Sequence, residues 1–374
     1  KTMASEKTKP LTEEIALAGE SSGKGREVDT LPARIERYGK AKRRASLNIR
    51  YLNETVDYCI DETGPLKRRL ENCGNWLLFR NYYTLGETRL VKARFCMKHL
   101  LCPLCAIRRG AKSLAAYLDR FEAIMAENAR LRPYLLTLTV TNGDDLQERF
   151  DHLVKSWKVY QDRRRQYFKR GRGFNELCKV EGAVFSYEFT HSEHGWHPHL
   201  HAIVLVDPDK PIDFDPRSSG AAKAESPLSR EWLAITGDSS IVDCRPIDTD
   251  DPAKSFAEVF KYALKFSDLP PELNYTAYQT LKGKRLQGSF GLFWGVKVPD
   301  KLTDDIPEEE LPYIELFYKY TRGGYTITEH AHHQGGERPR PTVTSPLAER
   351  TQKALDKAEE IRSNRWWYAE REQQ

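Results

Sequence analysis

Two histidines separated by a single leucine, His199 and His201, have the spacing to bind one divalent metal ion. They begin residues 199–206, a largely aliphatic and β-branched run that is typical of a buried strand. Because side chains on a strand repeat every second residue, both imidazoles would point to one face of a sheet and could bind an ion from the same side. A histidine-rich turn that leads into a buried strand is the alternative interpretation.

The preceding segment supplies a candidate third ligand, Glu188. In residues 183–190, aromatic residues alternate with polar ones, which is the pattern of a strand with one buried face. If residues 191–195 close an antiparallel hairpin, Glu188 lies opposite His199 and its carboxylate reaches the histidine face. A register shift of one residue would leave it a solvated glutamate. A carboxylate with two imidazoles suits Mn²⁺ or Mg²⁺ acting as a Lewis acid on a phosphate.

A second group of reactive side chains lies on a helix that the sequence predicts for residues 253–266. The apolar stripe of this helix leaves Glu258, Lys261, Tyr262 and Lys265 on the other side. A tyrosine has a pKa of about 10, so its hydroxyl attacks a phosphate only where the phosphate is polarised and cations lie nearby. The two lysines are candidates for those cations, and the glutamate lies one helical turn from the tyrosine. Taken alone, the tyrosine is also explained as an amphipathic surface residue.

The order of these motifs resembles that of the HUH endonucleases. An aliphatic strand over residues 134–140 comes first, the pair His199 and His201 follows, and Glu258-Val-Phe-Lys-Tyr262-Ala-Leu-Lys265 comes last. The last motif is similar to the Glu-x-x-Lys-Tyr-x-x-Lys motif of rolling-circle plasmid replication initiators. The resemblance covers about residues 70–300 of the chain. It implies an α+β fold of the ferredoxin-like kind, in which helices cover one face of an antiparallel sheet.

The same resemblance implies a site-specific, metal-dependent nickase and strand transferase that acts on single-stranded DNA at a plasmid origin. Tyr262 would attack the strand and stay joined to its 5′ phosphate, and Glu258 would activate water for the terminating cleavage. No nucleotide-binding motif accompanies these residues, so a host helicase would unwind the DNA and a host polymerase would extend it. Two alternatives stay open: a single-strand transposase or mobilisation relaxase of the same class, and a non-enzymatic zinc-containing regulator that binds DNA.

Four of the seven cysteines form a pattern that suits a structural zinc ion, distinct from the catalytic metal. The set is Cys73, Cys96, Cys102 and Cys105, with His99 as an alternative ligand to Cys73. Similar cysteine pairs precede the first motif in the resembled family. The other cysteines are expected to be small buried hydrophobes. Because no secretory signal is present, we expect a reducing bacterial cytoplasm and no disulfide framework.

Basic residues are concentrated in one segment, although the net charge of +5 is only a weak sign of nucleic-acid binding. In residues 163–172 aromatic side chains are interleaved with basic ones, so that bases could stack where phosphates are held. The candidate DNA-binding residues there are Arg163, Arg164, Arg165, Lys169, Arg170 and Arg172. A solvated helix end is the alternative. No apolar run is long enough to span a bilayer, so no membrane contact is expected.

The sequence predicts four parts in the chain, with boundaries where composition changes. These are a mobile polar and basic arm at 1–45, a zinc-binding module at 46–112, a nicking domain at 113–300, and an extension at 301–374 with a hairpin and a charged helix. Within the nicking domain, we expect a tight turn at residues 288–295 that packs aromatic side chains beneath the site. Nothing in the sequence indicates an oligomeric state.

Overall fold

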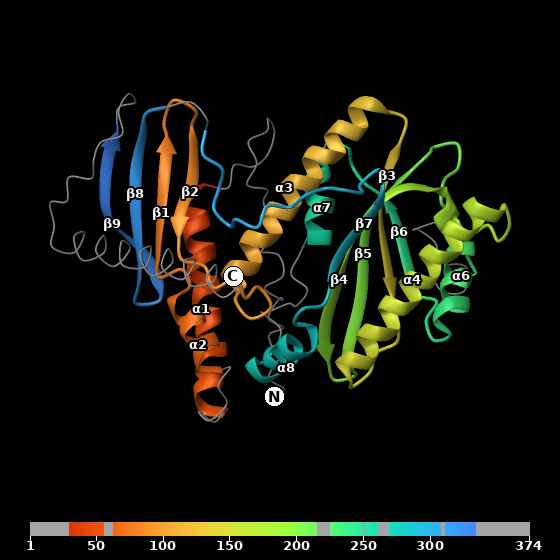
Figure 1. Ribbon diagram of the computed structural model, residues 1–374, viewed down its shortest axis with the longest axis horizontal. Helices are drawn as coiled ribbons and strands as arrows, with labels where there is room; N and C mark the ends of the chain where they lie inside the picture. The colour runs from red at the N-terminus through yellow and green to blue at the C-terminus, as the bar shows by residue number, and fades with distance from the viewer. Residues whose placement is uncertain are drawn as a thin grey trace, which may run out of the picture.

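The computed structural model describes residues 30–55, 63–214, 225–249, 251–260, 269–307 and 311–333. They form two antiparallel sheets that lie side by side, with the long helix α3 between them (Figure 1). None of the helices in these ranges is long and apolar enough to cross a membrane. Three predicted catalytic residues, Lys261, Tyr262 and Lys265, lie outside the described residues, as does the charged helix expected near the C-terminus.

The helices and strands follow one another along the chain with bounds close to those that hydrophobic periodicity predicts. The helices are α1 (Leu31–Thr55), α2 (Thr63–Asn72), α3 (Pro103–Glu127), α4 (Leu146–Arg170), the 3₁₀ turn η2 (Glu176–Lys179), α6 (Pro227–Thr236), α7 (Pro252–Phe260) and α8 (Pro271–Leu281). The strands are β1 (Trp76–Tyr82), β2 (Glu87–Ala93), β3 (Arg132–Thr139), β4 (Val180–Ser192), β5 (Gly195–Val206), β6 (Val242–Pro246), β7 (Gln287–Gly291), β8 (Tyr313–Thr321) and β9 (Gly324–His333).

Five of these strands form the sheet that we name sheet B, in the order β6-β3-β5-β4-β7. All neighbours in it are antiparallel. The strands expected over residues 134–140, 183–190 and 199–206 are confirmed, and the first half of the segment 288–295 forms the edge strand β7 instead of a turn. The histidine strand β5 is central, so strands on both sides can place side chains beside its imidazoles.

Helices cover both faces of sheet B (Figure 1). On one face α4 packs against β4, where the ring of Trp157 meets that of Phe185 at 5.3 Å between centroids. On the other face α3 and α7 share a cluster of apolar side chains with Ile203 of β5. The α+β class and the antiparallel sheet are thus confirmed, but the expectation that helices cover one face is wrong. Residues 202–206 of β5 are apolar and buried on both faces, so each face needs a cover.

Capping residues fix the ends of α4, which carries the basic segment. The Asp145 side chain accepts hydrogen bonds from the backbone N–H groups of Gln147 and Glu148, and Gly171 ends the helix in the left-handed conformation with φ of 69°. Lys169 and Arg170 lie in the last turn, where positive charge interacts favourably with the helix dipole. The predicted helix over residues 146–168 is therefore confirmed and extended by one half-turn.

The second sheet, sheet A, joins segments that the sequence analysis had assigned to different parts of the chain. Its order is β2-β1-β8-β9, with Leu78 of β1 opposite Phe317 of β8. The expected C-terminal hairpin is present, but it completes a sheet that β1 and β2 begin. Residues 311–333 are consequently no separate extension, because β1 would otherwise be an exposed edge strand.

The expected arm at residues 1–45 is wrong for its last part, because residues 31–45 belong to helix α1. Tyr38 and Ala41 of this helix are buried in the main core. Its cations are buried as well: Lys42 Nζ donates to the carbonyl oxygens of Glu71 and Cys73 at 2.8 and 2.5 Å. A helix with so many charged residues resembles a solvated segment in sequence, whereas here its charges have partners in the fold.

One carboxylate, that of Asp304, holds together α1, β2 and α3. Its oxygens pair with Arg34 at 3.1 Å and with Arg108, and accept a hydrogen bond from the Leu90 N–H at 2.6 Å. Arg108 is fully buried. Burial alone would raise the pKa of Asp304, but the Arg108 and Arg34 guanidinium groups lower it to about 2. The segment just after residue 300 is therefore an integral part of the core.

Candidate active site and cysteine cluster

The three histidines of β5 lie on one face of sheet B. The ring planes of His199 and His201 are 11° apart, with centroids separated by 5.8 Å. The ring of His197 lies 4.1 Å from that of His199. Leu200, between the two predicted ligands, points to the opposite face and is buried. The alternation that the sequence predicts is thus present, and it adds a third imidazole, His197, that the sequence analysis did not assign to the site.

Glu188 lies opposite His199 in the β4–β5 pairing, which is the register that the hairpin predicted. Its Oε2 lies 2.8 Å from Nε2 of His201. The other ring nitrogen of His201, Nδ1, lies 3.2 Å from the Thr137 hydroxyl on β3. Two strands therefore fix the orientation of the His201 ring, with Nε2 turned toward the carboxylate.

The contact between Glu188 and His201 allows a test of whether these residues fit a metal ion. Ligand atoms at neighbouring positions around an octahedral ion lie about 3 Å apart when each bond is about 2.1 Å long. The 2.8 Å between Oε2 and Nε2 matches that spacing. Among the described residues, however, only the four cysteines form a set of three or more ligand atoms within 4.8 Å of one another. An ion bound by all three residues would thus require the His199 side chain to move.

A second carboxylate on the same face, Asp243, was not found from the sequence. Thr137 of β3 pairs with His201 on one side and with Asp243 of β6 on the other, so all three side chains share the histidine face. Asp243 is half-buried and forms an ion pair with Arg245. The strand at residues 242–247 was predicted, but its register against β3 depends on a pairing across about a hundred residues that local pattern does not specify.

Helix α7 carries Glu258 to this face. The Ser186 hydroxyl of β4 donates a hydrogen bond to the Val259 carbonyl oxygen. Ser186 lies directly opposite His201 in the strand pairing, so the end of α7 lies beside the imidazoles. Phe256 and Phe260 anchor the helix in the cluster shared with α3. Glu258, one residue before Val259, is half-buried.

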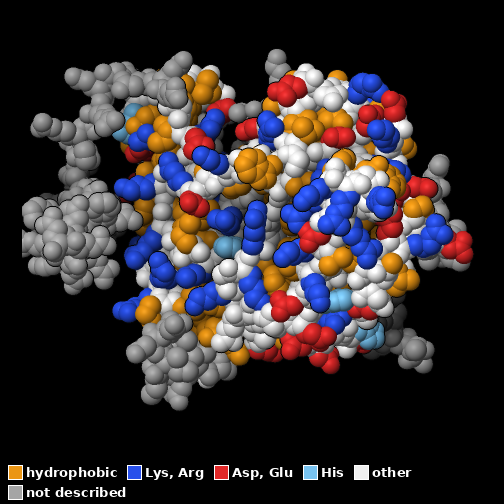
Figure 2. All heavy atoms as spheres, turned by 45° about the vertical axis from the view of Figure 1, so that its right-hand side comes forward, with side chains coloured by type: hydrophobic (Ala, Val, Ile, Leu, Met, Phe, Trp, Pro, Cys, Tyr) orange, Lys and Arg blue, Asp and Glu red, His pale blue; other side chains and the backbone are white. Residues whose placement is uncertain are grey.

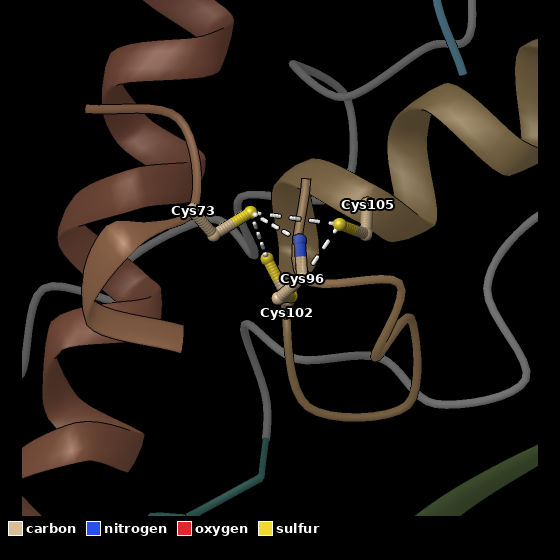
Figure 3. Close-up of side chains that lie close together, drawn as sticks. All are labelled: Cys73, Cys96, Cys102 and Cys105. Carbon is tan, nitrogen blue, oxygen red and sulfur yellow. Dashed lines mark hydrogen bonds between the residues drawn. The ribbon is translucent and has the colours of Figure 1, made fainter. Parts of the chain in front are cut away.

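The four predicted cysteines converge in a buried cluster (Figure 3). Sulfur atoms of Cys73 and Cys102 are 3.5 Å apart, those of Cys73 and Cys105 are 3.6 Å apart, and those of Cys96 and Cys105 are 3.5 Å apart. Four thiolates around a tetrahedral zinc ion, with Zn–S bonds of about 2.3 Å, would be about 3.8 Å apart. The four free thiols therefore have nearly the spacing that zinc requires.

The structure groups Cys73, and not His99, with the other three cysteines. Burial, followed by the charges of Arg109 and Lys98, lowers the pKa of His99 to about 4. A neutral imidazole could still bind zinc, but this one lies outside the cluster. Position and not chemistry excludes His99.

Local backbone conformation brings the cysteines together. Cys102 caps helix α3 and Pro103 occupies its first turn, so Cys105 follows in that same turn. The backbone N–H of Cys96 donates to the Cys73 sulfur at 3.4 Å. Hydrogen bonds from the neighbouring thiols lower the pKa of Cys73. The helix N-terminus and these donors favour thiolates, which are the form that binds a metal.

The basic segment lies at the C-terminal end of α4, on the face of sheet B opposite the histidines. Five of the six predicted DNA-binding side chains are exposed: Arg163, Arg165, Lys169, Arg170 and Arg172. Figure 2 shows Lys and Arg side chains grouped among hydrophobic ones on a face that includes this side of the molecule. Arg164 differs, because it donates to the carbonyl oxygens of Leu177 and Val180 at 3.2 and 2.7 Å. It also lies 4.9 Å from the ring centroid of Phe290, so it holds α4 to the sheet.

Comparison with known proteins gives one consistent family. The family of replication proteins matches residues 87–316, more than half of the chain. A protein named "Protein rep" from Streptococcus pneumoniae serotype 2 (strain D39) is 34% identical over 61% of this chain and 70% of its own length. "Protein rep" from Lactiplantibacillus plantarum is 27% identical over 66% of this chain and 78% of its own length.

A third relative, "Protein rep" from a Bacillus species, is 31% identical over 37% of this chain and 42% of its own length. No solved structure matches. The region that matches the family contains the histidine strand, Glu188, α7 and three of the four clustered cysteines. On the extent of the family match and the identity to the streptococcal relative, the chain belongs to the replication protein family.

Proposed function

We propose that this protein initiates rolling-circle replication of a plasmid by nicking one strand of the origin DNA. The observation that carries the proposal is the contact between Glu188 and His201 on the face that α7 approaches. Membership of the replication protein family supports an origin-binding initiator. The nickase activity is our own inference from the residues and from their resemblance to HUH endonucleases.

The reaction would begin with Tyr262. Its hydroxyl loses a proton and its oxygen attacks the scissile phosphorus, the bond from phosphorus to the 3′ oxygen breaks, and that oxygen takes up a proton to leave as a 3′-OH. A phosphotyrosine joined to the 5′ side of the strand remains, so the phosphodiester is conserved and no energy source is needed. Lys261 and Lys265, at neighbouring helical positions in the sequence, would balance the negative charge of the phosphate.

His199, His201 and Glu188 would hold a Mn²⁺ or Mg²⁺ ion beside that phosphate. When bound, the ion polarises a phosphate oxygen and lowers the barrier to attack. Thr137 keeps the His201 ring oriented, as the 3.2 Å contact with Nδ1 indicates. Glu258 precedes Tyr262 by one helical turn and would act as the general base that activates water to release the covalent strand.

The cysteine cluster would hold zinc in a purely structural role. It lies at the base of α3, the helix whose other end covers the histidine face of sheet B. A closed set of four thiolates leaves no open position for a substrate. We therefore expect this metal to stabilise the fold and to take no part in the reaction.

The protein would act in the bacterial cytoplasm on origin DNA, with a host helicase and a host polymerase. The released 3′-OH is the end that a polymerase extends. The exposed basic side chains of α4 would contribute contacts to phosphates.

A test of the proposed function is the formation of a covalent complex with a single-stranded origin oligonucleotide in the presence of Mn²⁺. We expect an SDS-resistant complex with the wild-type protein and with Tyr83→Phe, a tyrosine on the exposed β1–β2 turn. Tyr262→Phe should give none and should still bind the DNA. A protein that only regulates would bind origin DNA with no covalent complex under any metal condition, and that result would reject the nickase.

A further inference from the structure

A cavity of about 400 Å³ opens between α4 and the edge strand β7 of sheet B. It lies on the face opposite the histidines, so it is distinct from the candidate active site. Its lining combines cationic and aromatic side chains, chiefly Arg164, Arg165, Arg285, Tyr187, Phe290 and Trp294. Among the described residues that line it, none carries a carboxylate. We name this cavity the Trp294 groove.

Trp294 is the most exposed large hydrophobic side chain among the described residues, with 77% of its surface accessible. Its position is nevertheless fixed. The Trp294 N–H donates to the Gly291 carbonyl oxygen at 2.9 Å, and Gly291 itself has φ of +61° and no room for a side chain. The neighbouring Phe293 is fully buried against Tyr117 and Phe256. The loop thus holds an indole ring in solvent without allowing it to fold back.

An aromatic ring held rigidly in solvent loses little conformational entropy when a second ring stacks on it. The cations of the groove add a preference for anions. Arg285 is exposed, and Arg165 is exposed although it also contacts Asp162 beside the groove. A ligand with flat rings and negative charge fits this combination. The volume is at the lower end of the range of about 300–1,000 Å³ in which proteins bind small ligands.

We propose that the Trp294 groove binds one unpaired base of single-stranded DNA together with its phosphate. The inference rests on the proposed function, because that function makes single-stranded DNA the substrate. A paired base in a duplex has both faces covered by its neighbours, so only an unpaired base offers a face to the indole. The exposed cations of α4 continue from Arg165 toward the end of the helix, where Phe168 and Phe174 are also exposed.

The groove would hold the strand on the side of sheet B away from the nicking site. The loop after β7 connects the two sides, since Phe293 packs against Phe256 of α7 while Trp294 lines the groove. A strand leaving the histidine face could therefore pass around the β7 edge and be held on the other side. Such a second contact would keep the strand near the protein after cleavage, independently of the covalent bond.

The test measures the affinity of the full chain for a labelled oligo(dT) of about 16 nucleotides, a length that suits a single-strand binding site. Fluorescence anisotropy in EDTA-free buffer without added Mn²⁺ or Mg²⁺ reports binding alone. We expect Trp294→Ala to weaken binding by about 5- to 100-fold, the effect of losing one stacked base. Trp294→Phe, which keeps an aromatic ring, should retain most of the affinity. Tyr83→Ala, an exposed aromatic residue on sheet A, should bind as the wild type does.

Two further measurements separate the possible outcomes. Arg285→Ala should lower the slope of log affinity against log salt by about 0.7, as expected for one lost phosphate contact on a single strand. A duplex of the same length should bind Trp294→Ala and the wild type equally. An unchanged affinity of Trp294→Ala for oligo(dT), or an equal loss on the duplex, would overturn the proposal. If the wild type forms no covalent complex, the nickase is rejected while the oligo(dT) result still decides on the groove.

Discussion

The Glu188 carboxylate lies 2.8 Å from Nε2 of His201, across the β4–β5 hairpin. This pairing places an anion where it can either accept a hydrogen bond from the imidazole or share a metal ion with it. Ser186 and Thr137 occupy the neighbouring strand positions, so the His201 ring is enclosed by polar groups from two strands. The site is thus assembled by sheet register, with α7 added on top.

Metal binding should depend on this pair of residues. We expect His201→Ala to abolish the Mn²⁺ affinity seen by titration calorimetry, and Glu188→Ala to weaken it by about 10- to 100-fold. His194→Ala and Glu193→Ala change the same residue types in the exposed turn of the hairpin, and should leave the affinity unaltered. Equal Mn²⁺ affinity in His201→Ala and His194→Ala would show that the histidine strand binds no metal.

Zinc should be found in the purified protein and should contribute to stability. Elemental analysis is expected to give about one zinc ion per chain, since four thiolates fill one tetrahedral site. Cys105→Ser should lower the zinc content and reduce Tm by more than about 10 °C, because metal binding is coupled to folding. Cys178→Ala removes a buried cysteine outside the cluster and should keep its zinc. A zinc-free wild-type protein with an unchanged Tm would make the cluster an ordinary part of the core.

Asp304 should be far more important for stability than its neighbour Asp305. Asp304→Asn leaves the fully buried Arg108 without its carboxylate partner, which we expect to cost about 3–5 kcal/mol in the free energy of unfolding. Asp305 is exposed and contacts Lys112 at 3.1 Å, so Asp305→Asn should change that free energy by less than about 1 kcal/mol. Urea unfolding measures both values. Similar midpoints for the two variants would contradict the role given to Asp304.

Acid should remove the same contribution. The pKa of Asp304 is about 2 in the folded protein and about 3.9 in an unfolded chain. Its stabilising effect is therefore fully present above about pH 4 and is lost as pH falls toward 2. The gap between wild type and Asp304→Asn should accordingly narrow over this interval.

Glu258 should matter for termination and not for initiation. We expect Glu258→Ala to nick normally and then to accumulate over-long single-stranded products in a two-origin plasmid assay, because no carboxylate activates water to release the strand. Glu272→Ala, an exposed glutamate in the first turn of α8, should give unit-length circles. Unit-length circles from Glu258→Ala as well would reduce Glu258 to a surface residue of α7.

The sequence predicted the site where local pattern determines geometry. Alternation in β4 and β5 with a short polar connection fixes the hairpin register, so the placement of Glu188 opposite His199 could be derived without any tertiary information. The four cysteines were likewise predictable, because zinc ligands have characteristic spacings.

Long-range pairing could not be derived in the same way. The pairing of Leu78 with Phe317 joins strands separated by more than two hundred residues, and no local pattern marks it. Helix α1 was partly missed for a different reason. Its Arg34 and Lys42 resemble solvated charges in sequence, but both are buried because Asp304 and two backbone carbonyl groups pair with them. Asp243 was missed because its strand register depends on the whole sheet.

The most direct test of the central claim identifies the amino acid that is bonded to DNA. The covalent complex formed on origin DNA is digested with trypsin and nuclease, and the modified peptide is sequenced by mass spectrometry. We predict a 5′-phosphonucleotide on Tyr262, absent from Tyr262→Phe and present in Tyr83→Phe. A nucleotide on any other residue, or a nicked product with no modified peptide at all, would contradict the mechanism.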